Sequence, residues 1–209
     1  MRIIGGALGG RRFRGPPPGA TRPTADRVRE AVASALEARG AIEGARVLDL
    51  YAGTGALAFE ALSRGALRAT CVERDRRVAA SLEACATELG VRERIESIIG
   101  ELKPRLPAPL ESRLRRAAGG EGFDLVFADP PYADVDDVPP LLVRLAELHV
   151  LSPNALVVLE HATKHPPSAR APGVQPSTAP IFAVETAYRY GDTTVLFARV
   201  DADAEVSPT

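Results

Sequence analysis

A regular alternation of strand-like and helix-like segments constrains the fold of this chain more than any other feature. The strand-like runs are short and apolar, and the segments between them carry apolar residues at helical spacing. The strand-like runs cover residues 45–51, 67–73, 94–100, 123–128 and 155–161, and the helix-like segments cover 54–65, 74–90, part of 103–122, and 135–149. Because strands joined by helices pair in parallel, the sequence predicts an α/β fold, an open and mostly parallel sheet with helices on both faces.

The two ends of the chain depart from this alternation. Two strand-like runs near the C-terminus, 181–190 and 193–200, are separated only by a Gly-Asp turn, which predicts an antiparallel hairpin. At the N-terminus, apolar and basic residues flank the stretch GGALGG and predict a small β-hairpin or extended arm. We therefore expect three parts, which are a basic N-terminal hairpin or arm over 1–23, the main α/β domain over 24–200 and a flexible tail over 201–209.

Charge is distributed unevenly along the chain, although the formal net charge is only −1. Residues 1–40 carry eight arginines and three acidic residues, and the first 25 residues carry five arginines and no acid. Such a segment suits contact with the phosphates of a nucleic acid. However, only two of the 26 basic residues are lysine, so the coding bias of a GC-rich genome explains the arginines equally well.

Several features bear on the compartment and on metal binding. Cys71 and Cys85 lie within predicted elements, which indicates buried thiols in a reducing compartment. No run of about 18 apolar residues is present, and the N-terminus lacks the apolar core of a secretory signal. We expect a soluble, cytoplasmic protein without a membrane segment. The spacing of the three histidines is not that of a metal site, so no metal is expected.

A glycine-rich loop follows the first predicted strand, where ligands bind in α/β sheets. Gly53, Gly55 and Ala58 match the dinucleotide-binding pattern, and Glu73 ends the second strand at the distance expected of an acid that binds ribose. Asp49 decides between nucleotides, because a carboxylate at this loop repels a pyrophosphate and attracts a cation. S-adenosylmethionine carries an ammonium, a sulfonium and a ribose diol. The sequence therefore favours S-adenosylmethionine over NAD.

The motif Asp129-Pro130-Pro131-Tyr132 follows the apolar fourth strand. One interpretation is a rigid turn, since both prolines fix the backbone. A turn alone, however, requires neither the acid nor the aromatic residue. The Asp129 carboxylate and the Pro130 carbonyl would accept hydrogen bonds from the two N–H groups of a base's exocyclic amine, and Tyr132 would stack on the base. The motif therefore predicts direct, in-line methyl transfer to the amine of a flipped base, without a covalent enzyme intermediate.

Together these motifs resemble the RsmD family, bacterial methyltransferases of guanine N2 in 16S ribosomal RNA. The resemblance spans Arg2 to about Val200, and its carriers are RIIGG (2–6), RPTADRVREA (22–31), LDLYAGTGALAFEALSRGA (48–66), VERD (72–75), FDLVFADPPY (123–132) and YGDTTV (190–195). It implies a Rossmann-like methyltransferase fold, whose seven-stranded sheet has only its last strand antiparallel. It also implies S-adenosylmethionine as methyl donor and 16S ribosomal RNA, or an assembly intermediate of the small ribosomal subunit, as partner. We expect a monomer.

The resemblance also assigns roles to individual residues. Asp129, Pro130, Pro131 and Tyr132 would hold the target guanine. The residues expected to line the cofactor site are Asp49, Tyr51, Ala52, Gly53, Thr54, Gly55, Glu73, Arg74 and Glu101. The residues expected to bind RNA phosphate are Arg2, Arg11, Arg12, Arg14, Arg22 and Arg27.

Three positions depart from the family pattern, and other functions compete with this one. Ser34 stands in place of the usual asparagine, Cys85 in place of another asparagine, and Glu101 in place of an aspartate. Glu101 is either a ligand of the adenine amino group or a solvated acid at a helix start.

Three other functions compete with this one. The alternatives are an adenine-N6 methyltransferase of DNA or RNA, a non-catalytic RNA-binding ribosome assembly factor, and an NAD-dependent oxidoreductase, which Asp49 disfavours.

Overall fold

The computed structural model describes residues 1–15, 26–167 and 182–200. It divides into two compact units, Met1–Leu102 (unit 1) and Lys103–Thr209 (unit 2). Arg22 and the tail over 201–209 lie outside the described residues. Within the described residues, no helix is long and apolar enough to cross a membrane.

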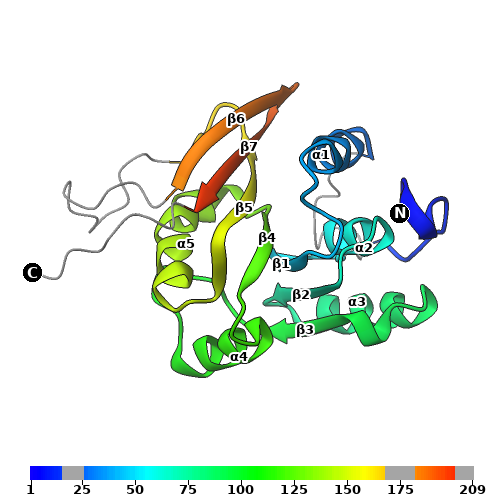
Figure 1. Cartoon of the computed structure of the whole chain (residues 1–209), viewed down its shortest axis with the longest axis horizontal. Coiled ribbons are helices and arrows are strands. Elements are labelled where there is room, and N and C mark those ends of the chain that lie inside the picture. Colours follow the sequence, from blue (N-terminus) through cyan, green and yellow to red (C-terminus); the bar gives the residue numbers. More distant parts are fainter. Residues whose placement is uncertain (16–25, 168–181, 201–209) are drawn as a thin grey trace, which may run out of the picture. The chain divides into compact units, whose positions relative to one another are not determined.

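Unit 1 is built on three parallel strands in the order β3-β2-β1 (Figure 1). Its strands are β1 (Arg46–Leu50), β2 (Arg68–Glu73) and β3 (Ile95–Ile99), and its helices are α1 (Asp26–Ala38), α2 (Ala56–Ser63) and α3 (Arg76–Glu88), with two 3₁₀ turns, η1 (Gly6–Leu8) and η2 (Arg92–Arg94). The register places Asp49 beside Cys71 and Glu73 beside Ile99. The acids at the ends of β1 and β2 therefore emerge at one edge of this sheet.

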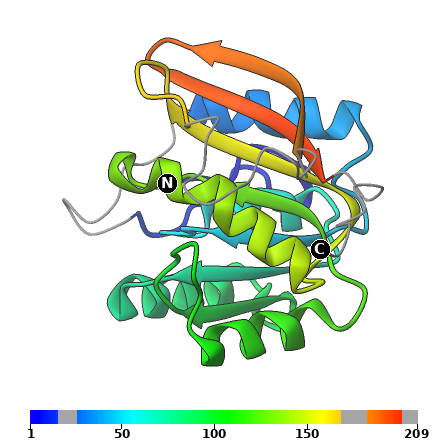
Figure 2. The same cartoon turned by 90° about the vertical axis from the view of Figure 1, so that its left-hand side faces the viewer.

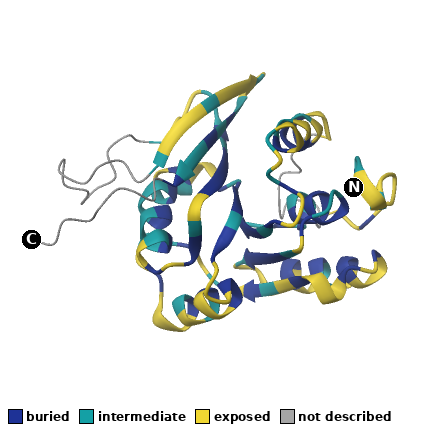
Figure 3. Ribbon diagram, viewed as in Figure 1, coloured by how far each residue is buried: buried dark blue, intermediate teal, exposed yellow. Residues whose placement is uncertain are grey.

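Helix α2 is the most deeply buried helix segment of unit 1, as its dark colour in Figure 3 shows. Six of its eight residues are buried, and they include the polar side chains of Glu60 and Ser63. Helix α3 is amphipathic instead, and Asp75 caps its start by accepting from the amides of Arg77 and Val78. Helix α2, in contrast, is short and buried on most sides, so neighbouring segments must enclose it.

The N-terminal segment folds back on itself and packs into unit 1. Arg2 and Arg12 form an antiparallel bridge, and the Ile3 amide donates to the Arg11 carbonyl at 2.9 Å. Ile3 and Phe13 are buried, and the Phe13 ring meets Phe59 of α2 edge-on at 5.3 Å. The described part of this segment, residues 1–15, is thus hairpin-like, and its apolar residues belong to the core of unit 1.

Unit 2 contains four strands in the order β4-β5-β7-β6. Its elements are α4 (Ala108–Ala118), β4 (Phe123–Ala128), η3 (Tyr132–Asp137), α5 (Val138–Glu147), β5 (Leu151–Ala162), β6 (Phe182–Tyr190) and β7 (Thr193–Val200). Strand β4 is parallel to β5, whereas β7 is antiparallel to both β5 and β6. Figure 2 shows the long β6–β7 hairpin beside β5, and Figure 3 shows that β6 is largely exposed.

These elements confirm the expected α/β class, the seven strands among the described residues and the antiparallel last strand. Most bounds lie within two residues of expectation, and two differ by more. Strand β5 begins at Leu151, four residues before the expected start, because Leu151 already pairs with Phe123 of β4. The register then shifts, so that the next pair is Leu125 with Leu156 and the extra residues lie in β5. The helix expected over 135–149 begins at Val138 and follows the 3₁₀ turn η3, with prolines in its first turn.

Candidate active site and its relatives

The loop after β1 has a backbone conformation that most residues avoid. Tyr51, Gly53 and Gly55 all have positive φ angles, 60°, 54° and 74° respectively. A Cβ atom on Gly55 would lie 2.9 Å from Leu82 Cδ1 and 3.2 Å from the Phe59 ring, so packing as well as φ requires glycine there. The turn brings the loop backbone close to the first turn of α2, a suitable site for a ligand.

Asp49 is a buried carboxylate at the base of this loop. Its side chain is 2% exposed in the folded chain, and its Oδ2 accepts a hydrogen bond from the Ala58 amide in the first turn of α2 at 3.2 Å. The positive end of the helix dipole stabilises a negative charge at this position. Burial, and then the nearby Asp49 charge, raise the pKa of the Cys71 thiol well above its usual value. A fixed anion at the base of the loop favours a cationic ligand.

Glu73 connects the glycine loop to the start of α3. Its Oε2 accepts from the Gly53 amide at 2.9 Å, and its Oε1 accepts from the Asp75 amide at 2.8 Å. The Gly100 amide, just after β3, donates to the Glu73 carbonyl at 3.0 Å. The ends of β1, β2 and β3 are therefore tied together around one half-buried acid.

The remaining expected cofactor residues lie around this group. Ala52 and Thr54 are half-buried in the glycine loop, and Thr54 Oγ1 contacts Met1 Sδ at 3.5 Å. Arg74 and Glu101 are exposed, one after β2 and the other after β3. Ile99, which the sequence reasoning did not select, is a 40% exposed apolar side chain beside Glu73. Consecutive strand residues face opposite sides of the sheet, so Ile99 is exposed where Ile98 is buried.

This group fits S-adenosylmethionine on structural grounds. It offers a buried carboxylate for a cationic centre, a second carboxylate for a diol, a close-approaching glycine backbone and an exposed apolar side chain for an adenine face. Histidine, cysteine, aspartate and glutamate do not gather into any group of three that would hold a metal ion, within the part of the chain that is described.

In unit 2, the motif Asp129–Tyr132 directly follows buried strand β4. Asp129 is half-buried, Pro130 is buried, and Tyr132 is 52% exposed at the start of η3. The Asp134 amide donates to the Pro131 carbonyl at 2.8 Å and closes the turn. The Tyr132 ring lies 6.4 Å from the ring of His165 at an angle of 31°. The motif thus presents an aromatic surface on a backbone that the two prolines stiffen.

Lys103 braces the turn that follows this motif, and the sequence reasoning did not assign it a role. Its Nζ donates to Asp134 Oδ1 at 2.9 Å and to Asp137 Oδ2 at 3.1 Å. These two hydrogen bonds, that to Asp134 first, raise the pKa of the Lys103 ammonium. Lys103 is one of only two lysines in the chain, and this rarity is the one feature of the sequence that marks it.

The arginines expected to bind RNA differ in how they are held. Arg11 donates to the carbonyls of Leu89 and Glu88, at 2.7 and 2.6 Å, at the end of α3. Arg2 lies 3.4 Å from Asp26, and Arg14 lies 4.0 Å from Glu88.

Two arginines of this group are less engaged. Arg12 and Arg27 are exposed and form no ion pair or hydrogen bond with the residues that the structure describes. They are therefore the members of the set with side chains most available to a partner.

Comparison with known proteins identifies the relatives of this chain. The family described as Conserved hypothetical protein 95 matches residues 1–179. Ribosomal RNA small subunit methyltransferase D of Haemophilus influenzae is 33% identical over 160 residues, which cover 77% of this chain and 78% of the relative. The protein of the same name from Escherichia coli K12 is 48% identical over 134 residues, 63% of this chain and 60% of the relative.

Solved structures agree with the fold. A hypothetical protein from Thermus thermophilus is 26% identical, with a TM-score of 0.67 over 96% of this chain and 99% of that one. An RNA methyltransferase from Salinibacter ruber, solved with S-adenosyl-L-homocysteine, has a TM-score of 0.60 at 20% identity over 87% of this chain and 95% of that one. Because the family match covers most of the length, the chain belongs to the Conserved hypothetical protein 95 or RsmD family of S-adenosylmethionine-dependent methyltransferases.

Proposed function

We propose that this enzyme methylates the exocyclic N2 of a guanine in bacterial 16S ribosomal RNA. The observation that carries the proposal is the motif Asp129–Tyr132, an acid, two prolines and a half-exposed aromatic ring directly after a buried strand. The names of the Haemophilus and Escherichia relatives support ribosomal RNA as the substrate class.

Residues of unit 1 would hold the methyl donor. Asp49 would hold the cationic methionine part, Glu73 would accept from the ribose hydroxyls, and Ile99 would pack against the adenine. When bound, S-adenosylmethionine supplies an electrophilic methyl group on a sulfonium. Glu73 is already fixed by the Gly53 amide, so little ordering is needed when the ligand arrives.

The motif in unit 2 would hold the acceptor. The amine of guanine is a poor nucleophile because its lone pair is delocalised into the ring. The Asp129 carboxylate and the Pro130 carbonyl would each accept a hydrogen bond from one N–H of the amine. These two bonds favour a tetrahedral nitrogen, while Tyr132 stacks on the flipped base. Rate enhancement then comes mainly from positioning and electrostatics, with Asp129 as the group that orients the amine.

The basic arm would supply binding to the RNA backbone. Arg2, Arg12 and Arg27 are exposed cations near the N-terminus, as expected for groups that contact phosphate without reading sequence. The substrate would be free 16S RNA or an assembly intermediate of the small subunit, and the enzyme would act as a monomer in the cytoplasm.

One experiment tests the proposal. The protein is incubated with labelled S-adenosylmethionine and undermethylated small subunits, in parallel with protein-free 16S RNA, and the modified nucleoside is mapped. We expect N2-methylguanine at a single position. Label in N6-methyladenine would favour the adenine alternative, and the absence of label in either substrate would favour a non-catalytic assembly factor.

A further inference from the structure

We infer that Glu60 of α2 is a positioning residue, which fixes the register of the N-terminal arm so that Arg2 and Arg12 lie together on its outward face. This inference rests on the proposed RNA-binding function of the arm. Helix α2 would then have two roles, since one end supports the glycine loop and the other end binds the arm.

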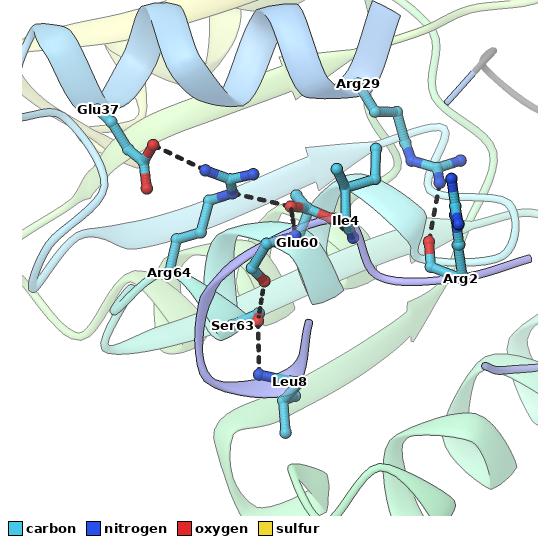
Figure 4. Close-up of polar contacts among 9 residues, drawn as sticks. Arg2, Ile4, Leu8, Arg29, Glu37, Glu60, Ser63 and Arg64 are labelled. Atoms are coloured by element: carbon cyan, nitrogen blue, oxygen red, sulfur yellow. Dashed lines mark hydrogen bonds and ion pairs between the residues drawn. The ribbon is translucent and has the colours of Figure 1, made fainter. Parts of the chain in front are cut away.

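Glu60 is a buried acid whose carboxylate binds the arm backbone. Its side chain is 4% exposed, and its oxygens accept from the Ile4 amide at 2.8 Å and from the Gly5 amide at 2.9 Å (Figure 4). An ionised carboxylate that accepts backbone amides forms hydrogen bonds of the stronger kind. The arm is therefore attached to α2 through its main chain, at one defined pair of residues.

An ion-pair chain holds Glu60 in place. Arg64 Nε donates to Glu60 Oε1 at 2.8 Å, and Arg64 Nη1 donates to Glu37 Oε2 of α1 at 2.7 Å. Burial lowers the pKa of the Arg64 guanidinium, but the hydrogen bonds to Glu60 and Glu37 outweigh that effect and raise it. The Glu60 charge is thus paired on one side and bonded to the arm on the other, as a buried charge requires.

Neighbouring contacts select the same register. Ser63 Oγ accepts from the Leu8 amide at 2.9 Å and donates to the Gly5 carbonyl (Figure 4). A Cβ atom on Gly6 would collide with the Ser63 carbonyl oxygen, at a backbone φ of +75°. Only glycine allows the arm to approach α2 this closely.

This register decides where the basic side chains point. Along an extended chain, alternate residues face opposite sides, and Ile3 and Phe13 face inward and are buried. Arg2 and Arg12, which pair across the bridge, therefore face outward together, and both are exposed. A slip of one residue would turn these two guanidinium groups toward the core and expose the apolar pair.

The opposite end of α2 carries the cofactor loop. Gly55 caps the helix start, and the Ala58 amide donates to Asp49, whereas Glu60 and Ser63 lie in the following turn. Met1 of the arm contacts Thr54 of the loop, but the Ala58–Asp49 hydrogen bond and the turn at Gly55 involve no arm residue, so we expect them to persist when the arm contacts at Glu60 are lost. Binding of RNA and binding of the cofactor are therefore separable by substitution.

Two variants perturb the docking from opposite sides. Glu60→Gln removes the charge and one acceptor from α2, and Gly6→Ala pushes the arm away without any change in α2. Glu30→Gln is the matched control, because Glu30 is exposed on α1 and forms no ion pair or hydrogen bond with the described residues. Exchange of the Ile4 and Gly5 amide hydrogens reports docking directly, and calorimetry reports the affinity for S-adenosylmethionine.

For both docking variants we expect at least a tenfold rise in KM for RNA, a smaller salt dependence of RNA binding and faster exchange at Ile4 and Gly5. We expect the affinity for S-adenosylmethionine to change less than twofold, and Glu30→Gln to match the wild type. Faster exchange with unchanged KM and salt dependence would overturn the inference, and so would an equal loss of cofactor affinity in Gly6→Ala. If the wild type methylates no RNA, the proposed function fails instead, while amide exchange still reports whether Glu60 docks the arm.

Discussion

The carboxylate of Glu73 accepts a hydrogen bond from the backbone amide of Gly53 at 2.9 Å, so the acid that ends β2 holds the loop that follows β1. Twenty residues separate the two along the chain. One side chain thus serves the shape of the loop and, in the proposed enzyme, the ribose of the cofactor.

Glu73→Ala removes both of these contributions. Hydrogen bonds to charged groups contribute about 1.5–3 kcal/mol, so we expect the affinity for S-adenosylmethionine to fall about ten- to hundredfold. Calorimetric titration measures this loss. Glu96→Ala on the neighbouring strand is the control, since Glu96 is exposed and unbonded within the described residues. Equal affinities of the two variants for S-adenosylmethionine would show that Glu73 does not contact the cofactor.

Gly55→Ala separates steric clash from backbone strain when it is compared with Gly90→Ala. Both glycines have φ near +74°, but only at Gly55 does the added Cβ meet side chains, whereas at Gly90 nothing lies within 4 Å. We expect Gly90→Ala to cost about 1–2 kcal/mol from φ alone. Gly55→Ala should cost about 1–3 kcal/mol more because of overpacking. Urea unfolding of the two variants provides the comparison, and equal midpoints would contradict it.

Asp129→Asn tests the acceptor geometry at the target amine. The amide has one acceptor oxygen and a misplaced donor, so we expect kcat to fall at least about a hundredfold, as when one polar group of a preorganised site is removed. The affinity for S-adenosylmethionine should stay within twofold. Asp192→Asn, in the exposed β6–β7 turn, is the control for unit 2. Turnover at the wild-type rate in Asp129→Asn would refute the role of Asp129.

Arg12 and Arg11 are neighbours with different expected phenotypes. Arg12 is exposed and unbonded within the described residues, so Arg12→Ala should reduce the salt slope of RNA binding by about one unit. Arg11 binds the last carbonyls of α3, so Arg11→Ala should instead lower the free energy of unfolding by about 0.5–1.5 kcal/mol. Filter binding at several salt concentrations and urea unfolding distinguish the two. The reverse pattern would argue against RNA binding by the arm and leave the coding bias of a GC-rich genome as the explanation of its arginines.

The Cys71 thiol provides a test that depends on pH. Burial, and then Asp49, raise its pKa above the ordinary value of 9.0, so the folded state favours the neutral thiol. Its contribution to stability is therefore complete below pH 9 and is lost as the pH rises further. We expect the wild type to lose more stability than Cys71→Ala between about pH 9 and pH 10.5, as measured by urea unfolding. Parallel curves for the two proteins would contradict the shift.

Sequence patterns predicted the fold wherever local signals agreed with tertiary context. The bounds of β4 and β7 match the expected 123–128 and 193–200, because apolar runs there end at clear turn residues. The start of β5 was missed because Pro153 and Asn154 are typical of a loop, and Asn154 has a positive φ of 62° inside the strand. Pairing of Leu151 with Phe123, on the far side of the irregular segment of β5, outweighs those local preferences.

The positions of two candidate residues in the fold were predictable for a different reason. Polar residues directly after strands lie at one edge of a parallel sheet, so Asp49 and Glu73 followed from chain position alone. Contacts between segments far apart in sequence were not predictable in this way. Glu60 lies 56 residues from Ile4, and its only signal was a single acid in the apolar helix ALAFEALS.

The docking of the arm has a practical consequence for truncated proteins. Removal of residues 1–14, as a means of deleting basic charge, would also remove the amides of Ile4 and Gly5 and leave Glu60 with unmet hydrogen-bonding capacity beside a newly exposed Phe59. Such a truncation would report the loss of a core element together with the loss of RNA affinity. Substitution of outward-facing arginines, with the backbone left intact, isolates the electrostatic contribution.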